Sequence, residues 1–164
     1  MHSYDPSGWH DVSAAVAGAS AALAGLLFVA ISINLKQIIA VPVLAARAAT
    51  ALGALFLALV ISILILVPGQ SRPVLGAELL VCAVPVWLAT TYGYVRVGRA
   101  KEQSRFAYGA DLTIAQLAVV PIVCAGVSVI AGAGGGLYWL VPALVFVFVS
   151  AGVKAWVLLV EVMR

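Results

Sequence analysis

Few side chains of this sequence could do chemistry, and four of them lie within or at the end of long apolar runs. Only 9% of the 164 residues are charged. Polar groups inside apolar runs are costly to bury, and they often line a ligand site or an ion path. The four residues are Lys154, Asn34, Gln116 and Thr90. We predict that they form one polar vestibule or ligand site at the cytoplasmic end of the molecule.

Lys154 is the most informative of these residues. An ammonium group at the middle of a membrane helix costs about 2.5 to 3.5 kcal/mol on insertion scales. The simpler interpretation is that its long stem reaches the lipid headgroups, or that it pairs with Asp111 or Glu161. The functional interpretation is a residue that binds an anionic ligand in the vestibule. The sequence leaves both interpretations open.

Four further cations are close together in the segment RVGRAKEQSR, residues 96–105. Such a cluster attracts anionic lipid headgroups by about 1 kcal/mol per cation. We therefore predict headgroup contacts for Arg96, Arg99, Lys101 and Arg105, without recognition of a specific lipid.

Catalytic and metal chemistry have little support. His2, Asp5, His10 and Asp11 offer imidazole and carboxylate groups, but their spacing matches no closed metal site. The Ser-His-Asp, HExxH, P-loop and GxGxxG patterns do not occur. We predict no metal, no cofactor and no enzymatic activity.

The amino-acid composition indicates the class of protein in which these residues are positioned. Hydrophobic residues make up 65% of the chain, the mean hydropathy is +1.18 and the net charge is +3. A soluble domain is about half apolar and about 25% charged. The composition excludes a soluble domain, a disordered chain, a secreted disulfide scaffold and a nucleic-acid binder. The chain is predicted to be an integral membrane protein that contacts the lipid bilayer.

Five apolar stretches are long enough to cross a bilayer as helices of about 20 residues. They cover residues 12–35, 47–67, 74–95, 112–132 and 138–160. We predict an all-α, five-helix membrane bundle that forms a single domain over residues 1–164. A polar connection is expected at 96–111 and a flexible turn at 131–136.

The cations predict the orientation of this bundle. Eight of the nine Lys and Arg residues fall on one side if the N-terminus is outside, and only Arg72 falls on the other. Because cytoplasmic loops of membrane proteins are rich in Lys and Arg, we predict an external N-terminus and a cytoplasmic C-terminus.

Small residues mark one face of the first span. Ala14, Gly18 and Ala22 follow one another at intervals of four, and Gly25 lies beside them. Such a row lets a second helix approach closely. Packing within the bundle is the simpler interpretation, with Ala125, Gly126 and Gly132 of the fourth span offered as a complement. A seam with a second copy or with a partner protein is the alternative.

Three prolines lie within or near the start of spans, at Pro85, Pro121 and Pro142. Proline removes the hydrogen bond to the carbonyl four residues earlier. Each is therefore expected to free a carbonyl and to bend its helix, which is also common in membrane proteins.

Several stretches carry a resemblance to a known group of proteins. They are the opening YDPSGWHDV, the following ASAALAGLLFVAISINLKQI, and then PGQ and LGAELL after the second span. Over roughly the first 80 residues the chain resembles small bacterial multi-span proteins described as modulators of an FtsH-type membrane protease. The resemblance implies a non-enzymatic protein of the bacterial inner membrane that acts through a partner.

Three functions stay open at this point. The first is a non-catalytic membrane protein that acts by helix association, as a homo-oligomer or as an accessory of a membrane complex. The second is a small oligomeric channel or transporter with a vestibule around Lys154. The third is a lipid- or quinone-binding membrane subunit that uses Trp87 and the carbonyls freed by proline.

Overall fold

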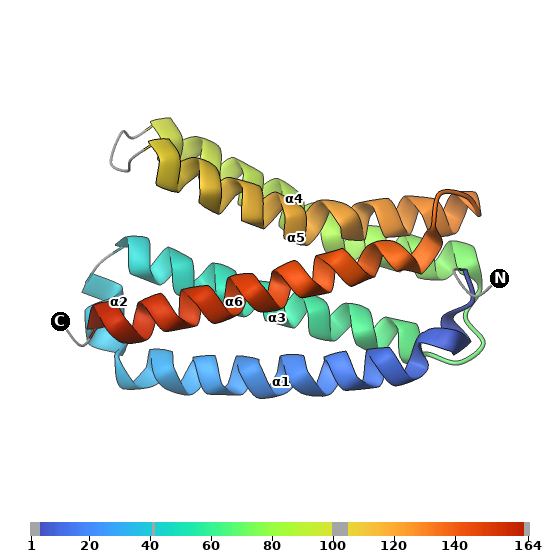
Figure 1. Cartoon of the computed structure of the whole chain (residues 1–164), viewed down its shortest axis with the longest axis horizontal. Coiled ribbons are helices and arrows are strands. Elements are labelled where there is room, and N and C mark those ends of the chain that lie inside the picture. Colours follow the sequence, from blue (N-terminus) through green and yellow to red (C-terminus); the bar gives the residue numbers. More distant parts are fainter. Residues whose placement is uncertain (1–3, 41, 100–104, 163–164) are drawn as a thin grey trace.

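The chain folds into helices joined by short turns (Figure 1). The computed structural model describes residues 4–40, 42–99 and 105–162, and the side chains of these ranges other than 42–43, 93–111 and 157–162. The described residues contain no strand. The elements are η1 (Pro6–Trp9), α1 (His10–Ile33), α2 (Leu35–Ala40), α3 (Pro42–Leu66), α4 (Arg72–Arg99), α5 (Arg105–Ala131), η2 (Gly136–Trp139) and α6 (Leu140–Val162).

The described chain has five helical segments long and apolar enough to cross a membrane. These segments are Pro6–Ile33, Leu44–Leu66, Arg72–Tyr92, Leu112–Ala131 and Gly136–Trp156. Each of the five predicted stretches coincides with one of them. A helix satisfies its own backbone hydrogen bonds, so long apolar runs favour this structure over any that leaves polar groups in lipid.

The helices form two groups that meet at one end (Figure 1). α1 packs chiefly on α3, α4 packs on α5, and α6 contacts both α3 and α5. We call the two ends of the bundle the α2 end, at Leu35–Ala40, and the η2 end, at Gly136–Trp139. Toward the α2 end, the α4–α5 hairpin leans away from α3 and α6 (Figure 1).

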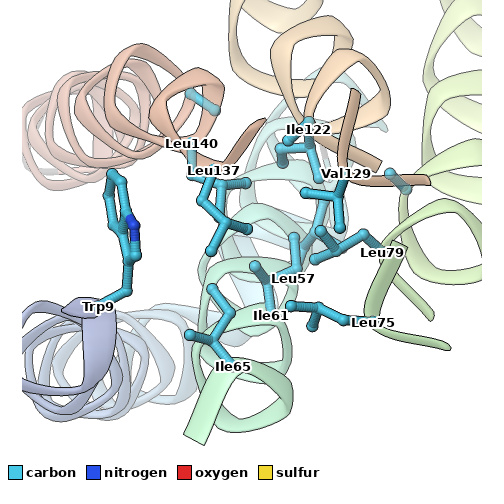
Figure 2. Close-up of a cluster of buried hydrophobic side chains, with 13 residues drawn as sticks. Trp9, Leu57, Ile61, Ile65, Leu75, Leu79, Ile122, Val129, Leu137 and Leu140 are labelled. Carbon is cyan, nitrogen blue, oxygen red and sulfur yellow. The ribbon is translucent and has the colours of Figure 1, made fainter. Parts of the chain in front are cut away.

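Large apolar side chains close the bundle toward the η2 end (Figure 2). They come from η1, α3, α4, α5, η2 and α6, and each is less than 9% exposed. The residues labelled in Figure 2 are Trp9, Leu57, Ile61, Ile65, Leu75, Leu79, Ile122, Val129, Leu137 and Leu140. We call them the closing cluster. Trp9 also contacts Tyr138 edge to face, with ring centroids 5.1 Å apart.

A second buried cluster joins α1, α2, α3, α5 and α6 and is richer in alanine. Ala48, Ala51 and Ala58 of α3 are at most 3% exposed, as is Leu27 of α1. Small side chains let helix backbones approach closely, which is how membrane helices gain packing energy.

α4 and α5 approach each other closely at Gly76 and Gly126. A Cβ atom added to Gly76 would lie 2.8 Å from the carbonyl oxygen of Gly126 and 2.5 Å from Cγ1 of Ile130. The expectation that residues 125–132 complement the first span is therefore wrong, because Gly126 is already in contact with α4.

The connections differ from expectation in two places. α4 continues to Arg99 and α5 begins at Arg105, so most of the expected polar connection at 96–111 is helix. Arg and Ala, which recur in this segment, are good helix formers. The turn at 131–136 is held in a specific shape, because Ser128 Oγ donates to the Ala133 carbonyl and accepts from Gly136 N at 2.7 Å. Gly135 adopts a φ of 105° there, which favours glycine.

The prolines divide into two kinds. Pro85 and Pro121 lie inside α4 and α5. Pro142 lies in the first turn of α6, where backbone N–H groups lack helical partners anyway. The carbonyl of Tyr138 accepts a hydrogen bond from Leu140 N, so the expectation that Pro142 frees it is wrong.

Candidate functional site

A pocket of about 280 Å³ lies between α3, α4, α5 and α6, on the α2 side of the closing cluster. Its walls are mostly small and apolar. The lining includes Thr50, Gly53, Leu57, Ala89, Thr90 and Lys154.

Lys154 supplies the cation of this pocket. It is partly exposed on α6, and its Nζ atom donates to Thr50 Oγ1 of α3 at 3.4 Å. Thr50 Oγ1 in turn donates to the carbonyl of Arg47 at 3.0 Å. The side chains of Asp111 and Glu161 lie outside the described part, so the expected pairing of Lys154 with either of them stays a prediction.

Thr90 lines the same pocket from α4 but directs its hydroxyl to its own helix. Thr90 Oγ1 lies 2.8 Å from the Val86 carbonyl oxygen and 3.0 Å from that of Trp87. A threonine that bonds to carbonyls three and four residues earlier satisfies its donor within the helix. Thr90 therefore presents mainly its methyl group to the pocket.

Gln116 joins α5 to α4 beside the pocket. Trp87 Nε1 donates to Gln116 Oε1 at 2.7 Å, and Gln116 Nε2 donates to Thr91 Oγ1 at 3.0 Å. Both contacts link the two helices of the hairpin. The sequence did not identify this network.

Asn34 lies apart from the other three predicted residues. It follows α1, and its Nδ2 atom donates to the Ala30 carbonyl at 3.1 Å. It borders a separate depression formed by residues 32–37. The structure thus brings Lys154 and Thr90 together, places Gln116 beside them, and separates Asn34 from all three.

The predicted small-residue face of α1 points out of the bundle. Ala14, Gly18, Ala22 and Gly25 are all exposed. A Cβ atom added to Gly18 or Gly25 would meet nothing within 4 Å. The interpretation that this face packs within the chain is therefore wrong.

A different face of α1 packs on the bundle. Ser13, Ser20, Ala24 and Leu27 are its buried residues. The hydroxyl of Ser20 is buried without a hydrogen-bond partner. α1 packs through this face chiefly on α3.

Most of the described cations lie toward the α2 end. Lys36 lies on α2, Arg47 lies near the start of α3, α4 ends at Arg99 and α5 begins at Arg105. Arg72 lies at the η2 end, 6.0 Å from the ring centroid of Tyr4. The side chains of Arg96, Arg99 and Arg105 are not described, and Lys101 lies outside the described residues. Their contacts with lipid headgroups stay predictions.

No group of three or more His, Cys, Asp or Glu residues that could hold a metal occurs in the described part of the chain. No protein-family model, curated protein or solved structure matches the sequence. The geometry and chemistry of the chain itself therefore carry the functional argument.

Proposed function

We propose that this chain is a non-catalytic, multi-pass protein of the bacterial inner membrane that acts by helix association through α1. The observation that carries the proposal is the exposed face of Ala14, Gly18, Ala22 and Gly25, which no part of the described chain covers. In the proposed orientation, the α2 end faces the cytoplasm, because it collects the cations.

The character of the exposed surface changes along α1, and this change supports a protein partner. Toward the α2 end, the exposed residues of α1 include Leu26, Phe28 and Ile33, which are 61–77% exposed. Such large apolar side chains suit contact with lipid. Toward the η2 end, the exposed residues are mainly Ala and Gly. These leave little surface for lipid but let another helix approach closely.

Two kinds of partner fit this face: a second copy of the chain, and a helix of a larger membrane complex. The resemblance of the first 80 residues to described protease modulators favours an accessory role, because the small-residue face lies within that region. A homo-oligomer requires only the chain itself, so it is the first state to test.

The test is the size of the purified protein in detergent, measured by light scattering. We expect an oligomer for the native chain and a smaller particle for the Gly18→Leu/Gly25→Leu variant, because the leucine side chains would keep the helices apart. Gly152→Leu is a matched control, since Gly152 is an exposed helical glycine of α6 with open space around it. An unchanged size of the double variant would contradict association through this face.

The pocket around Lys154 relates to the second function, a channel. It reaches Leu57, which belongs to the closing cluster. The packed side chains of that cluster weigh against a passage through one bundle. A channel built from this chain would therefore run between copies, which makes the oligomeric state the deciding measurement for this function too.

A further inference from the structure

We propose that the pocket between α3, α4, α5 and α6 binds one acyl chain of an anionic phospholipid, with the headgroup beside Lys154. This inference shares membrane insertion with the proposed function, but it does not depend on association through α1. No residue of the small-residue face of α1 lines the pocket.

The walls of the pocket favour hydrocarbon over water. A volume of about 280 Å³ is large enough to hold several waters. Waters in a cavity need two to four polar partners each, and apolar cavities of this kind stay dry or bind apolar molecules. The Thr90 hydroxyl bonds to its own helix, and the Thr50 hydroxyl bonds to the Arg47 carbonyl and to Lys154. Ser150 is the remaining polar residue of the lining, so few polar groups are left for water.

The pocket is accessible from the side of the bundle, where an acyl chain would enter. Among its lining residues, Ala49 and Gly53 of α3 and Ala89 of α4 are exposed. All three are small, so we place the mouth of the pocket between α3 and α4. A Cβ atom added to Gly53 would meet nothing within 4 Å. In a membrane, this mouth would face lipid tails.

Charge complementarity indicates the headgroup. Lys154 is the one cation among the described lining residues, and it is held toward Thr50 on the α2 side of the pocket. Lys36 and Arg47 lie at the same end of the bundle. An ammonium group near the membrane surface attracts a phosphate. A phospholipid whose tail fills the pocket would thus place its phosphate close to this group of cations.

The experiment uses a phosphatidylglycerol that carries a photoreactive diazirine on its acyl chain. The full-length protein is reconstituted in phosphatidylcholine vesicles that contain a small fraction of this probe, illuminated and digested, and the labelled peptides are identified by mass spectrometry. We expect labelling to concentrate on residues 49–57 and 86–90, above the labelling of outward-facing residues such as Val81 and Trp156. Uniform labelling of all exposed surfaces would indicate bulk lipid alone and would overturn the proposal.

Variants that fill the pocket give the second measurement. Gly53→Leu and Ala89→Leu add bulk from opposite walls, and both should reduce labelling of the pocket peptides severalfold. Gly152→Leu should leave this labelling unchanged. Two pocket variants are used so that a folding defect in one, visible as lost helical circular dichroism, leaves the other to decide. Unchanged labelling of the pocket peptides in a folded variant would overturn the proposal. A pocket that takes no label because a second copy of the chain covers it would also overturn the proposal.

The headgroup is tested by comparing phosphatidylglycerol with a phosphatidylcholine probe that carries the same acyl chain. We expect Lys154→Gln to lower the preference for the anionic probe about fivefold, which corresponds to about 1 kcal/mol for one cation. Equal labelling by the two probes in the native protein would overturn the proposed preference for an anionic headgroup. Gly18→Leu/Gly25→Leu separates the two proposals, because it should change the particle size and leave the pocket labelling intact.

Discussion

Polar side chains within the apolar helices mostly bond to their own backbone. Ser62 Oγ donates to the Ala58 carbonyl at 2.8 Å, Ser32 Oγ does the same to Phe28, and Asn34 bonds to Ala30. A side chain whose polar group bonds to the backbone carbonyl four residues earlier needs no partner on another helix. A polar residue in an apolar run is therefore weak support for a functional site. Asn34 is an example, because its amide bonds to its own helix and it lies apart from Lys154.

Gln116 behaves differently, because both ends of its amide bond to side chains of α4. We predict that Gln116→Leu lowers the stability of the protein by about 1 to 2 kcal/mol, since hydrogen bonds between membrane helices average about 0.6 kcal/mol and reach about 1.7 kcal/mol. Trp87 Nε1 would also lose its acceptor, and Thr91 Oγ1 would lose a donor. The measurement is an unfolding titration in mixed micelles, followed by circular dichroism.

A double-mutant cycle shows whether the network itself is responsible. Trp87→Phe should cost less stability in the Gln116→Leu background than in the native chain, because the shared hydrogen bond is already absent. Additive losses would mean that the two side chains contribute through packing alone.

At the scale of elements, the α4–α5 crossing depends on Gly76. We predict that Gly76→Ala lowers stability by about 1 to 3 kcal/mol, because the new methyl group would press on the backbone of Gly126 and on Ile130. Gly152→Ala is the matched control, since it makes the same change in an open helical position outside the small-residue face of α1, and it should be neutral or gain up to about 1 kcal/mol from helix propensity. Equal effects of the two substitutions in the mixed-micelle titration would show that the crossing tolerates a wider separation.

The helices themselves could be predicted from the sequence, but their packing faces could not. The length of an apolar run is enough to predict a membrane-spanning helix, and all five runs are helices. A periodic polar face normally shows which side of a helix is exposed. These helices are apolar on every side, so the row of Ser13 and Ser20 could not be recognised as buried, nor the row of Ala14 and Gly18 as exposed. The partner of Gly126 was mistaken for the same reason.

The candidate site could be predicted only in part. The sequence shows how deep a residue lies along a helix, but not which side of the helix its side chain occupies. Lys154, Thr90 and Gln116 were placed at similar depth, and the structure keeps them near one another. The pocket itself arises from small residues such as Gly53 and Ala89 on facing helices. No spacing within one helix indicates that these residues face each other.

At the scale of the whole molecule, the uneven distribution of charge predicts how the bundle lies in the membrane. We predict that a single cysteine at Ser71, near the η2 end, reacts with a membrane-impermeant maleimide added to intact spheroplasts, whereas one at Lys36 on α2 reacts only after lysis. Both positions are exposed, and the native thiols are first removed by Cys82→Ala and Cys124→Ala. We expect this difference in labelling because the Lys- and Arg-rich ends of membrane proteins are retained in the cytoplasm.

The outcome of this labelling also determines which leaflet supplies the proposed lipid. With Lys36 inside, the Lys154 end of the pocket lies in the cytoplasmic leaflet, where it can recruit anionic headgroups from the inner surface. Labelling of Lys36→Cys from outside, with Ser71→Cys protected, would contradict the predicted orientation. That result would not contradict association through α1, because helices can associate side by side within the membrane in either orientation. The lipid would then come from the outer leaflet, and its selectivity would have to be measured against the lipids present there.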